Sequence, residues 1–171
     1  LLSMGTVLIR MVPPVVVAVP MYVLWTKFGL TGGLSGLVLA YLGLTIPLNV
    51  WMLSIFIKEI PFELEEAAAI DGCSYMRILW GIVVPLIKPG ISVTSVFTFR
   101  TAWNEFLLAI ILSNRSTRTL PAAVSLMISD LGINWGQIMA MATIIAIPAF
   151  IVTFACSKNL ITGMTAGAVK G

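Results

Sequence analysis

FGLTGGLSGLVLAYLGLTIPLNVWMLSIFI, the stretch from Phe28 to Ile57, contains no charged residue. A helix of about 20 predominantly apolar residues is long enough to cross the hydrocarbon core of a bilayer. A charge at the centre of such a helix costs about 2.5–3.5 kcal/mol on insertion scales, so a long charge-free run is typical of a membrane span. The stretch therefore predicts one transmembrane helix near Leu34–Ile57.

Two more uncharged stretches lie on either side of this one. Leu131 to Ser157 predicts a second clear span, near Trp135–Ser157. Met11 to Thr26 is short, would have to extend back to about Met4, and contains Pro13, Pro14 and Pro20. Because proline removes a backbone donor and bends a helix, we expect this third span to be kinked.

A fourth span is predicted at Ile91 to Leu112, although it contains Arg100, Asn104 and Glu105. Polar residues in a span usually face the interior of the bundle or a water-filled path. Arg100 and Asn104 share a helix face, whereas Glu105 lies about 140° around the helix from Arg100, so these two are not a simple ion pair. The predicted fold class is all-α, a polytopic membrane helix bundle with about four transmembrane helices.

The composition also indicates a membrane protein. Hydrophobic residues make up 59% of the 171 residues and charged residues 10%, whereas soluble domains carry about 45–50% and about 25%. This excludes a soluble enzyme and a disordered chain, and a net charge of +3 provides no basic stripe for nucleic acid. The lack of histidine excludes a Ser-His-Asp triad and an HExxH zinc site. Cys73 and Cys156 form no CxxC pair and predict neither a zinc site nor a disulfide scaffold.

The first residues, Leu1 to Gly5, contain neither an initiator methionine at position 1 nor the basic region of a signal peptide. We therefore expect the chain to open within a helix, as the later part of a longer protein. Residues 1–171 are interpreted as a single transmembrane domain that is truncated at its N-terminus.

The block from Lys58 to Pro89 is a polar segment between two predicted spans, and it holds five of the seven acidic residues. With four spans, this block and the C-terminal tail lie on the same side of the membrane. That side carries five Lys and Arg residues, and the opposite side carries three. The positive-inside rule favours a cytoplasmic location for the block and the tail.

A short helix is predicted in the first half of this block. Pro61 suits the first helical turn, and the helix dipole favours the acidic residues that follow, Glu63, Glu65 and Glu66. Ala67 to Ala69 have high helix propensity. Gly72 is expected to end the helix, because glycine adopts the left-handed cap without strain.

A second short helix is predicted from Ser74, as its N-cap, to about Val84. Three residues are expected to break the chain before the next span, namely Pro85, Pro89 and Gly90. An ordinary interfacial loop is the alternative, but an anionic leaflet attracts basic rather than acidic helices. A helix that docks on another protein fits better.

One motif in this block resembles the EAA loop of ABC-importer permeases. Glu66-Ala67-Ala68 is followed after three residues by Gly72, and after nine more by Ile82-Val83-Val84-Pro85. The family pattern is EAA, three residues, Gly, nine residues, I-x-L-P, so only Val84 departs from it, where the pattern has leucine.

Three further motifs are similar to the carbohydrate-uptake branch of this family, and within it to the maltose-type second permease subunit. They are Trp103-Asn104-Glu105-Phe106, Thr119-Leu120-Pro121 and the ending from Gly163 to Gly171. The resemblance covers nearly the whole chain. Because family members typically have six spans, the first two are expected to be missing here.

The resemblance implies that residues 58–89 form a cytoplasmic coupling loop, with a helix pair that docks in a cleft of an ATPase subunit. Glu66 would pair with a basic residue of the ATPase, the alanines would allow close approach, and Gly72 would set the angle between the two helices. The implied ATPase-coupling residues are Glu66, Ala67, Ala68, Asp71, Gly72 and Pro85.

The resemblance also implies a heteromeric complex in a bacterial cell membrane: a second permease subunit, two ATPase subunits and an extracytoplasmic sugar-binding protein. The tail from Thr165 to Gly171 would approach the ATPase dimer. Because the sequence lacks the GxxxxGK[ST] P-loop, ATP and Mg would be used by the partner subunits, and no cofactor is expected on this chain. The loop before the last span would contact the binding protein through Met127, Ile128, Asp130, Leu131, Gly132, Ile133 and Asn134.

Four residues are candidates for the translocation path, namely Arg100, Trp103, Asn104 and Glu105. Alternatively, the polar residues among them, Arg100, Asn104 and Glu105, would pack against the partner permease, and the sequence favours neither interpretation. Whether this subunit or its sister would bind the substrate is open as well.

The resulting interpretation is a non-enzymatic, membrane-spanning permease subunit of an ATP-driven carbohydrate importer, which would act by alternating access. A permease for another solute, such as glycerol phosphate, is an alternative. Two other classes of protein compete with it. An intramembrane aspartyl-type protease needs paired acids within spans, where only Glu105 occurs. A non-transporting membrane scaffold would be found without an ATPase partner.

Overall fold

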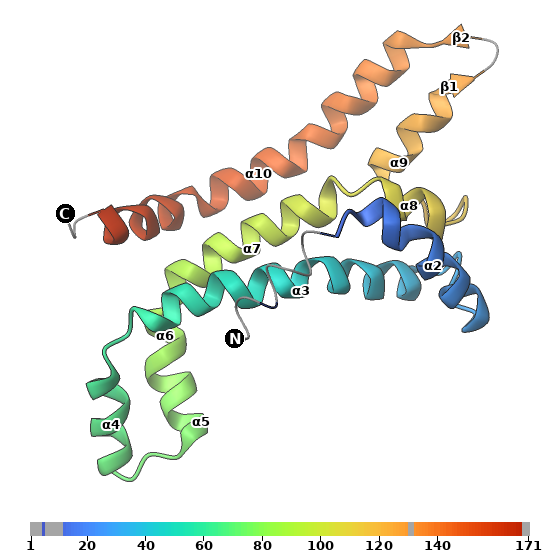
Figure 1. The fold of residues 1–171 in the computed structure, drawn as a ribbon. Helices are drawn as coiled ribbons and strands as arrows, with labels where there is room; N and C mark the ends of the chain where they lie inside the picture. Colours follow the sequence, from blue (N-terminus) through green and yellow to red (C-terminus); the bar gives the residue numbers. More distant parts are fainter. Residues whose placement is uncertain (1–4, 6–11, 130–131, 169–171) are drawn as a thin grey trace.

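The computed structural model describes residue 5, residues 12–129 and residues 132–168. Apart from one short β-ribbon, the described elements are helices, which confirms the all-α membrane fold (Figure 1). In chain order the elements are α2 (Pro14–Lys27), α3 (Leu34–Lys58), α4 (Phe62–Ile70), α5 (Tyr75–Ile78), the π-helix η1 (Leu79–Val83), α6 (Val84–Leu86), α7 (Lys88–Trp103), α8 (Leu107–Leu112), α9 (Leu120–Val124), the 3-10 helix η2 (Ser125–Met127), β1 (Ile128–Ser129), β2 (Gly132–Ile133) and α10 (Trp135–Ala168).

Two of the described helices are each long and apolar enough to cross a membrane. They are α3, with 25 residues, and the part of α10 from Trp135 to Cys156, with 22 residues. Both predicted clear spans are thereby confirmed. A third span is possible if the helices on either side of Ile87, which meet at 74°, are counted as one bent element.

The expected kinked span from about Met4 to Thr26 is interrupted, and its part before Val12 lies, apart from Gly5, outside the described residues. Val12 and Pro13 are not helical, and α2 begins only at Pro14. A residue that precedes proline is pushed out of the helical region by the proline ring. Pro13 is such a residue, and its ψ of 134° is extended. Pro20 is accommodated inside α2.

The expected span from Ile91 to Leu112 is likewise interrupted. The helix ends at Trp103 and restarts at Leu107 as α8. Glu105 explains the restart, because its carboxylate accepts hydrogen bonds from the backbone N–H of Leu108 at 2.9 Å and of Ala109 at 3.0 Å. These N–H groups have no partner within the helix, so an acidic side chain at this point stabilises a new helix start.

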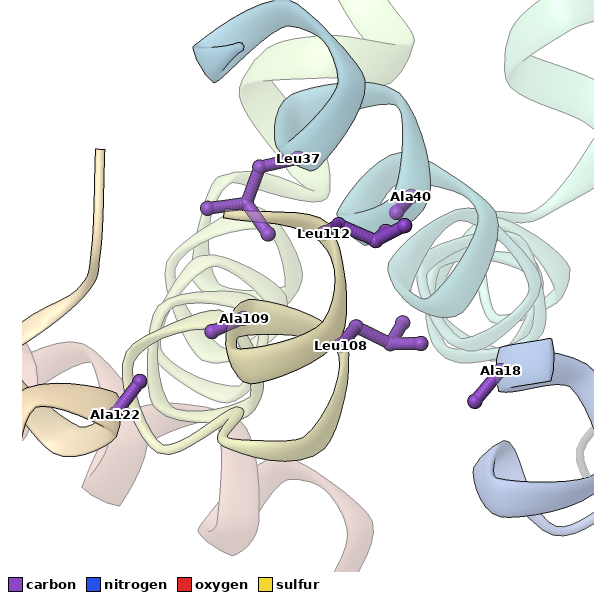
Figure 2. Packing of buried hydrophobic residues seen from close by; sticks show 7 residues of the cluster. All are labelled: Ala18, Leu37, Ala40, Leu108, Ala109, Leu112 and Ala122. Atoms are coloured by element: carbon purple, nitrogen blue, oxygen red, sulfur yellow. The ribbon is translucent and has the colours of Figure 1, made fainter. Parts of the chain in front are cut away.

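One core cluster joins α2, α3, α8 and α9 (Figure 2). Its two largest fully buried side chains are Leu108 and Leu112 of α8. The remaining members are mostly alanines, which let helix backbones approach closely in a membrane. The complete cluster is Ala18, Leu37, Ala40, Leu108, Ala109, Leu112 and Ala122.

The central helix is α7, which packs against both α3 and α10. Its contact with α3 includes a hydrogen bond of 2.5 Å from the Thr98 hydroxyl to Asn49 Oδ1. Its contact with α10 includes a hydrogen bond of 3.1 Å from Trp103 Nε1 to the Ile145 carbonyl. Polar side chains therefore tie the three helices together, as is common between membrane helices.

Candidate functional site

The first candidate site is the hairpin from Phe62 to Leu86, which projects from one end of the molecule (Figure 1). Its first helix, α4, confirms the helix predicted after Pro61. Pro61 lies at the N-cap rather than in the first turn, while Glu63 and Glu65 occupy the first turn. Their charges are placed where the positive end of the helix dipole favours them.

Gly72 closes α4 in the left-handed conformation, with φ of +77°, which confirms the prediction for this residue. Two backbone hydrogen bonds surround it, from Gly72 N to the Ala69 carbonyl and from Cys73 N to the Ala68 carbonyl, both 3.0 Å long. This pair of bonds is the Schellman pattern, which satisfies carbonyl groups at the helix end. The turn therefore depends on a positive φ at position 72.

We expect Gly72→Val to strain this turn by about 1–2 kcal/mol or more, because a side chain clashes with the backbone at positive φ. The two halves of the hairpin would tilt, and the sugar uptake that the family resemblance implies would fall at unchanged membrane abundance. Gly72→Asn is the matched control, since asparagine tolerates this conformation better than valine. Full uptake by Gly72→Val at normal abundance would show that the turn needs no glycine.

The second half of the hairpin differs in detail from the prediction. Ser74 is at the N-cap of α5, but its side chain makes no capping hydrogen bond. The helix then passes through the π-helix η1 into α6 and bends at Ile87. The expected breakers lie inside helices instead. Pro85 lies in α6, directly after the π-helix η1, and Pro89 and Gly90 are in the first turn of α7, where the missing Pro89 N–H has no helical acceptor to lose.

Ala68 faces the inside of the hairpin. It is buried together with Ile78, Val83 and Ile87. Its small side chain therefore allows the two halves of the hairpin to pack closely. Glu66, Ala67 and Asp71 of the same motif are exposed, and so is Pro85.

The exposed face of the hairpin is apolar as well as acidic. Ile70 is 86% exposed and Tyr75 is 76% exposed, and Met76 and Trp80 are also exposed. Large apolar side chains gathered on a projecting element indicate a surface that another molecule covers.

The four residues expected on a translocation path have different surroundings. Trp103 and Glu105 are engaged within the chain, with the Ile145 carbonyl and with the start of α8. Arg100 and Asn104 are exposed and lie one turn apart at the end of α7. No ion pair links Arg100 to Glu105 among the described residues.

Of the cavities that border both α3 and α7, two share a lining residue, and neither was expected from the sequence. The Arg118 cavity, about 480 Å³, is lined by residues that include Leu34, Tyr41, Trp103, Arg118 and Thr119. The Asn49 cavity, about 390 Å³, is lined by residues that include Asn49, Leu53, Thr94, Ser95 and Thr98. Phe99 lines both. A sequence signal was present in Thr94 and Thr98, which are four residues apart and therefore share a helix face.

Buried polar atoms gather at these cavities. The Tyr41 hydroxyl, Thr94 Oγ1, Arg118 Nε and Thr119 Oγ1 are buried without a hydrogen-bond partner among the described residues. All four residues line one of the two cavities. A buried polar group without a hydrogen-bond partner lowers the stability of the fold. A cluster of such groups therefore indicates a functional site, where a ligand can supply the missing partners.

The loop before α10 is an exposed β-ribbon at the end of the molecule opposite the hairpin (Figure 1). Ile128 pairs with Ile133 across two antiparallel strands, and both side chains are exposed. Met127 ends the preceding 3-10 helix, and Gly132 has φ of +123°. Asn134 Oδ1 accepts a hydrogen bond from Gln137 N at 3.1 Å, at the start of α10. Asp130 and Leu131 lie outside the described residues.

Metal chemistry has no evident site in the described part of the chain. No three His, Cys, Asp or Glu side chains come together there. Cys73 and Cys156 are both free.

Comparison with known proteins gives a consistent result. The model of the family described as binding-protein-dependent transport system inner membrane component matches residues 1–165. The diacetylchitobiose uptake system permease protein of Streptomyces coelicolor is 34% identical over 98% of this chain and 61% of its own. The trehalose/maltose transport system permease protein of Thermococcus litoralis is 35% identical over 85% of this chain and 53% of its own. The chain therefore spans about 53–61% of the length of these two relatives.

A solved structure shows the same fold. A bacterial ABC transporter involved in the import of the acidic polysaccharide alginate matches 88% of this chain and 54% of its own, with a TM-score of 0.57 and 23% sequence identity. The fold of most of this chain is thus one that an experimental structure also contains.

Proposed function

We propose a function from one premise: this chain belongs to the family of binding-protein-dependent transport system inner membrane components. The chain is the membrane-spanning permease subunit of an ATP-driven sugar importer, and it works by alternating access together with a second permease subunit. The names of the relatives, which refer to diacetylchitobiose, trehalose and maltose, support a sugar as the substrate. The partner ATPase subunits bind Mg and hydrolyse ATP, since this sequence has no P-loop.

The observation that carries the proposal is the projecting hairpin with its exposed acidic and apolar face. A docking helix must present side chains that gain from being covered, and Ile70 and Tyr75 are almost free of contacts within the chain. Glu66 and Asp71 add charges for basic partner groups. We place this hairpin on the cytoplasmic side against the ATPase, where it transmits ATPase closure to α7 through the bend at Ile87.

The substrate path is proposed to run beside α7. Arg100 and Asn104, exposed at its end, would line the path, while Glu105 and Trp103 keep the helix break and α10 in place. A discontinuous membrane helix is a frequent feature of transporter binding regions.

The test is uptake by the complete complex. The full-length subunit, its sister permease, the ATPases and the binding protein are reconstituted in vesicles with radiolabelled maltose, trehalose or diacetylchitobiose. ATP-dependent accumulation of one of these sugars is expected. Accumulation of glycerol phosphate alone would change the substrate class, and a subunit that never co-purifies with an ATPase would overturn the proposal in favour of a scaffold.

A second measurement concerns the β-ribbon. Replacing residues 128–133 with a Gly/Ser linker removes the exposed Ile128 and Ile133, which we propose contact the sugar-loaded binding protein. Uptake at subsaturating binding protein is expected to fall about tenfold, the change that about 1.4 kcal/mol of lost contact produces. ATPase docking should be unchanged, because the hairpin lies at the opposite end of the molecule. Uptake at the wild-type rate by the linker variant would show that the ribbon only connects η2 to α10 and makes no contact that transport requires.

A further inference from the structure

We infer that the α3–α7 groove, formed by the Arg118 cavity and the Asn49 cavity, binds a sugar ring of the transported substrate against Phe99. This inference rests on the proposed sugar transport and assigns a substrate site to this subunit. Phe99 lines both cavities and therefore stands at the point where they meet.

The groove follows the membrane-crossing direction. Its lining residues on α3 run from Leu34 to Leu53. At 1.5 Å per residue this distance is about 28 Å, close to the roughly 30 Å thickness of the hydrocarbon core. Each cavity also falls within the usual size of ligand sites, about 300–1,000 Å³. A solute in the groove would therefore lie along the route it has to travel.

The aromatic part of the groove suits one face of a sugar. Phe99 and Trp103 are stacked, with ring centroids 5.4 Å apart and an interplanar angle of 20°. The C–H groups on the face of a pyranose are apolar and pack on an aromatic ring, while its hydroxyls point outward and need polar partners. Two adjacent rings that are already ordered by each other offer such a platform without much loss of side-chain freedom.

The polar part suits the hydroxyls. Asn49 Oδ1 is occupied by Thr98, and the amide nitrogen of Asn49 makes no hydrogen bond among the described residues, so it is available as a donor. Ser95 donates to the Ile91 carbonyl, which leaves its oxygen as an acceptor. The Arg118 side chain has neither a hydrogen bond nor an ion pair within the described part of the chain. Its buried Nε therefore remains available as a donor to a solute hydroxyl.

A neighbouring helix of the second permease could instead fill the groove. A packing surface for a helix would be lined by small or apolar residues, with few free donors. The free Asn49 amide and the unpaired Arg118 favour a polar solute, and the experiment separates the two occupants.

The first experiment compares Phe99→Ala with Phe97→Ala in the reconstituted full-length complex, using whichever of the three labelled sugars the wild type accumulates. Phe97 is exposed on the same helix but lines neither cavity. KM for uptake is expected to rise about tenfold, equivalent to about 1.4 kcal/mol, in Phe99→Ala and to change little in Phe97→Ala. Co-purification of the sister permease should be unchanged in both variants.

The second experiment detects binding without transport. Ser95→Cys, in a Cys73→Ser and Cys156→Ser background, is labelled by a water-soluble thiol reagent, and the sugar is expected to slow the labelling. Thr143→Cys, exposed on α10, should show no protection. The sugar site would be overturned if the KM of Phe99→Ala were unchanged and the sugar did not protect Ser95→Cys. The proposed function would still stand in that case, provided that the wild-type complex accumulates the sugar. Loss of the sister permease from Phe99→Ala would identify the groove as a subunit interface, and failure of wild-type uptake would remove the proposed function and this site together.

Discussion

Glu66→Lys is expected to abolish ATP-driven sugar uptake while leaving the subunit folded in the membrane. Glu66 is exposed on α4 and has no role in the hairpin core formed by Ala68, Ile78 and Val83. If its carboxylate pairs with a basic residue of the ATPase, as we propose, the bond is worth about 1.5–3 kcal/mol. Lysine would replace that attraction with repulsion between like charges. The measurement is sugar uptake together with ATP hydrolysis by the purified complex.

Two controls separate the contact from general charge effects. Glu66→Gln removes the charge but keeps the shape, so its loss of coupling should be smaller than that of the lysine variant. Glu59→Lys makes the same charge change at an exposed position outside α4 and should transport normally. Normal assembly and normal transport in Glu66→Lys would contradict the proposed docking role.

Gly36→Ala is expected to have the largest effect on stability. A Cβ atom at position 36 would lie 2.1 Å from the backbone carbonyl oxygen of Leu30 and 3.0 Å from Cδ1 of Trp25. The backbone at Leu30 cannot rotate away as a flexible side chain could, and Trp25 Nε1 also donates a hydrogen bond of 2.7 Å to the Gly36 carbonyl. The overpacking should cost about 3 kcal/mol, at the upper end of the usual range.

The measurement is thermal unfolding of the detergent-purified complex. Gly43→Ala is the matched control on the same helix, because a Cβ atom there meets nothing within 4 Å. It should be neutral or slightly stabilising, since alanine favours a helix more than glycine does. Equal unfolding temperatures for the two alanine variants would show that the turn before α3 yields freely to a side chain at position 36.

Local features of the candidate sites could be predicted from the sequence. The positive φ of Gly72 followed from its place after an alanine-rich helix, because glycine is the residue that adopts this conformation at little cost. The exposed acidic helix α4 followed from its own composition. The inward position of Ala68 could not be predicted, because alanine suits both a tight internal packing and a close external contact. Only the folding of α5 and η1 back onto α4 placed Ala68 inside.

The substrate groove depended entirely on tertiary contacts. Phe99 and Asn49 are fifty residues apart in the sequence, and nothing in either helix alone brings them to a common cavity. Thr94 and Thr98 indicated a polar face on α7 without showing what lies opposite it. Arg118 was counted in the sequence only as one of the charges outside the spans, and the structure places it in the lining of a cavity.

The sequence by itself determined the membrane class, the spans α3 and α10 and the glycine-closed helix α4. Hydropathy and backbone preference act over one element at a time, so a local pattern is sufficient for them. Tertiary structure alone decided that Trp103 donates a hydrogen bond to the Ile145 carbonyl, that α7 packs between α3 and α10, and that Phe99 lines two cavities. Each of these depends on which distant groups come into contact or leave a space unfilled, and that is settled only when the helices pack.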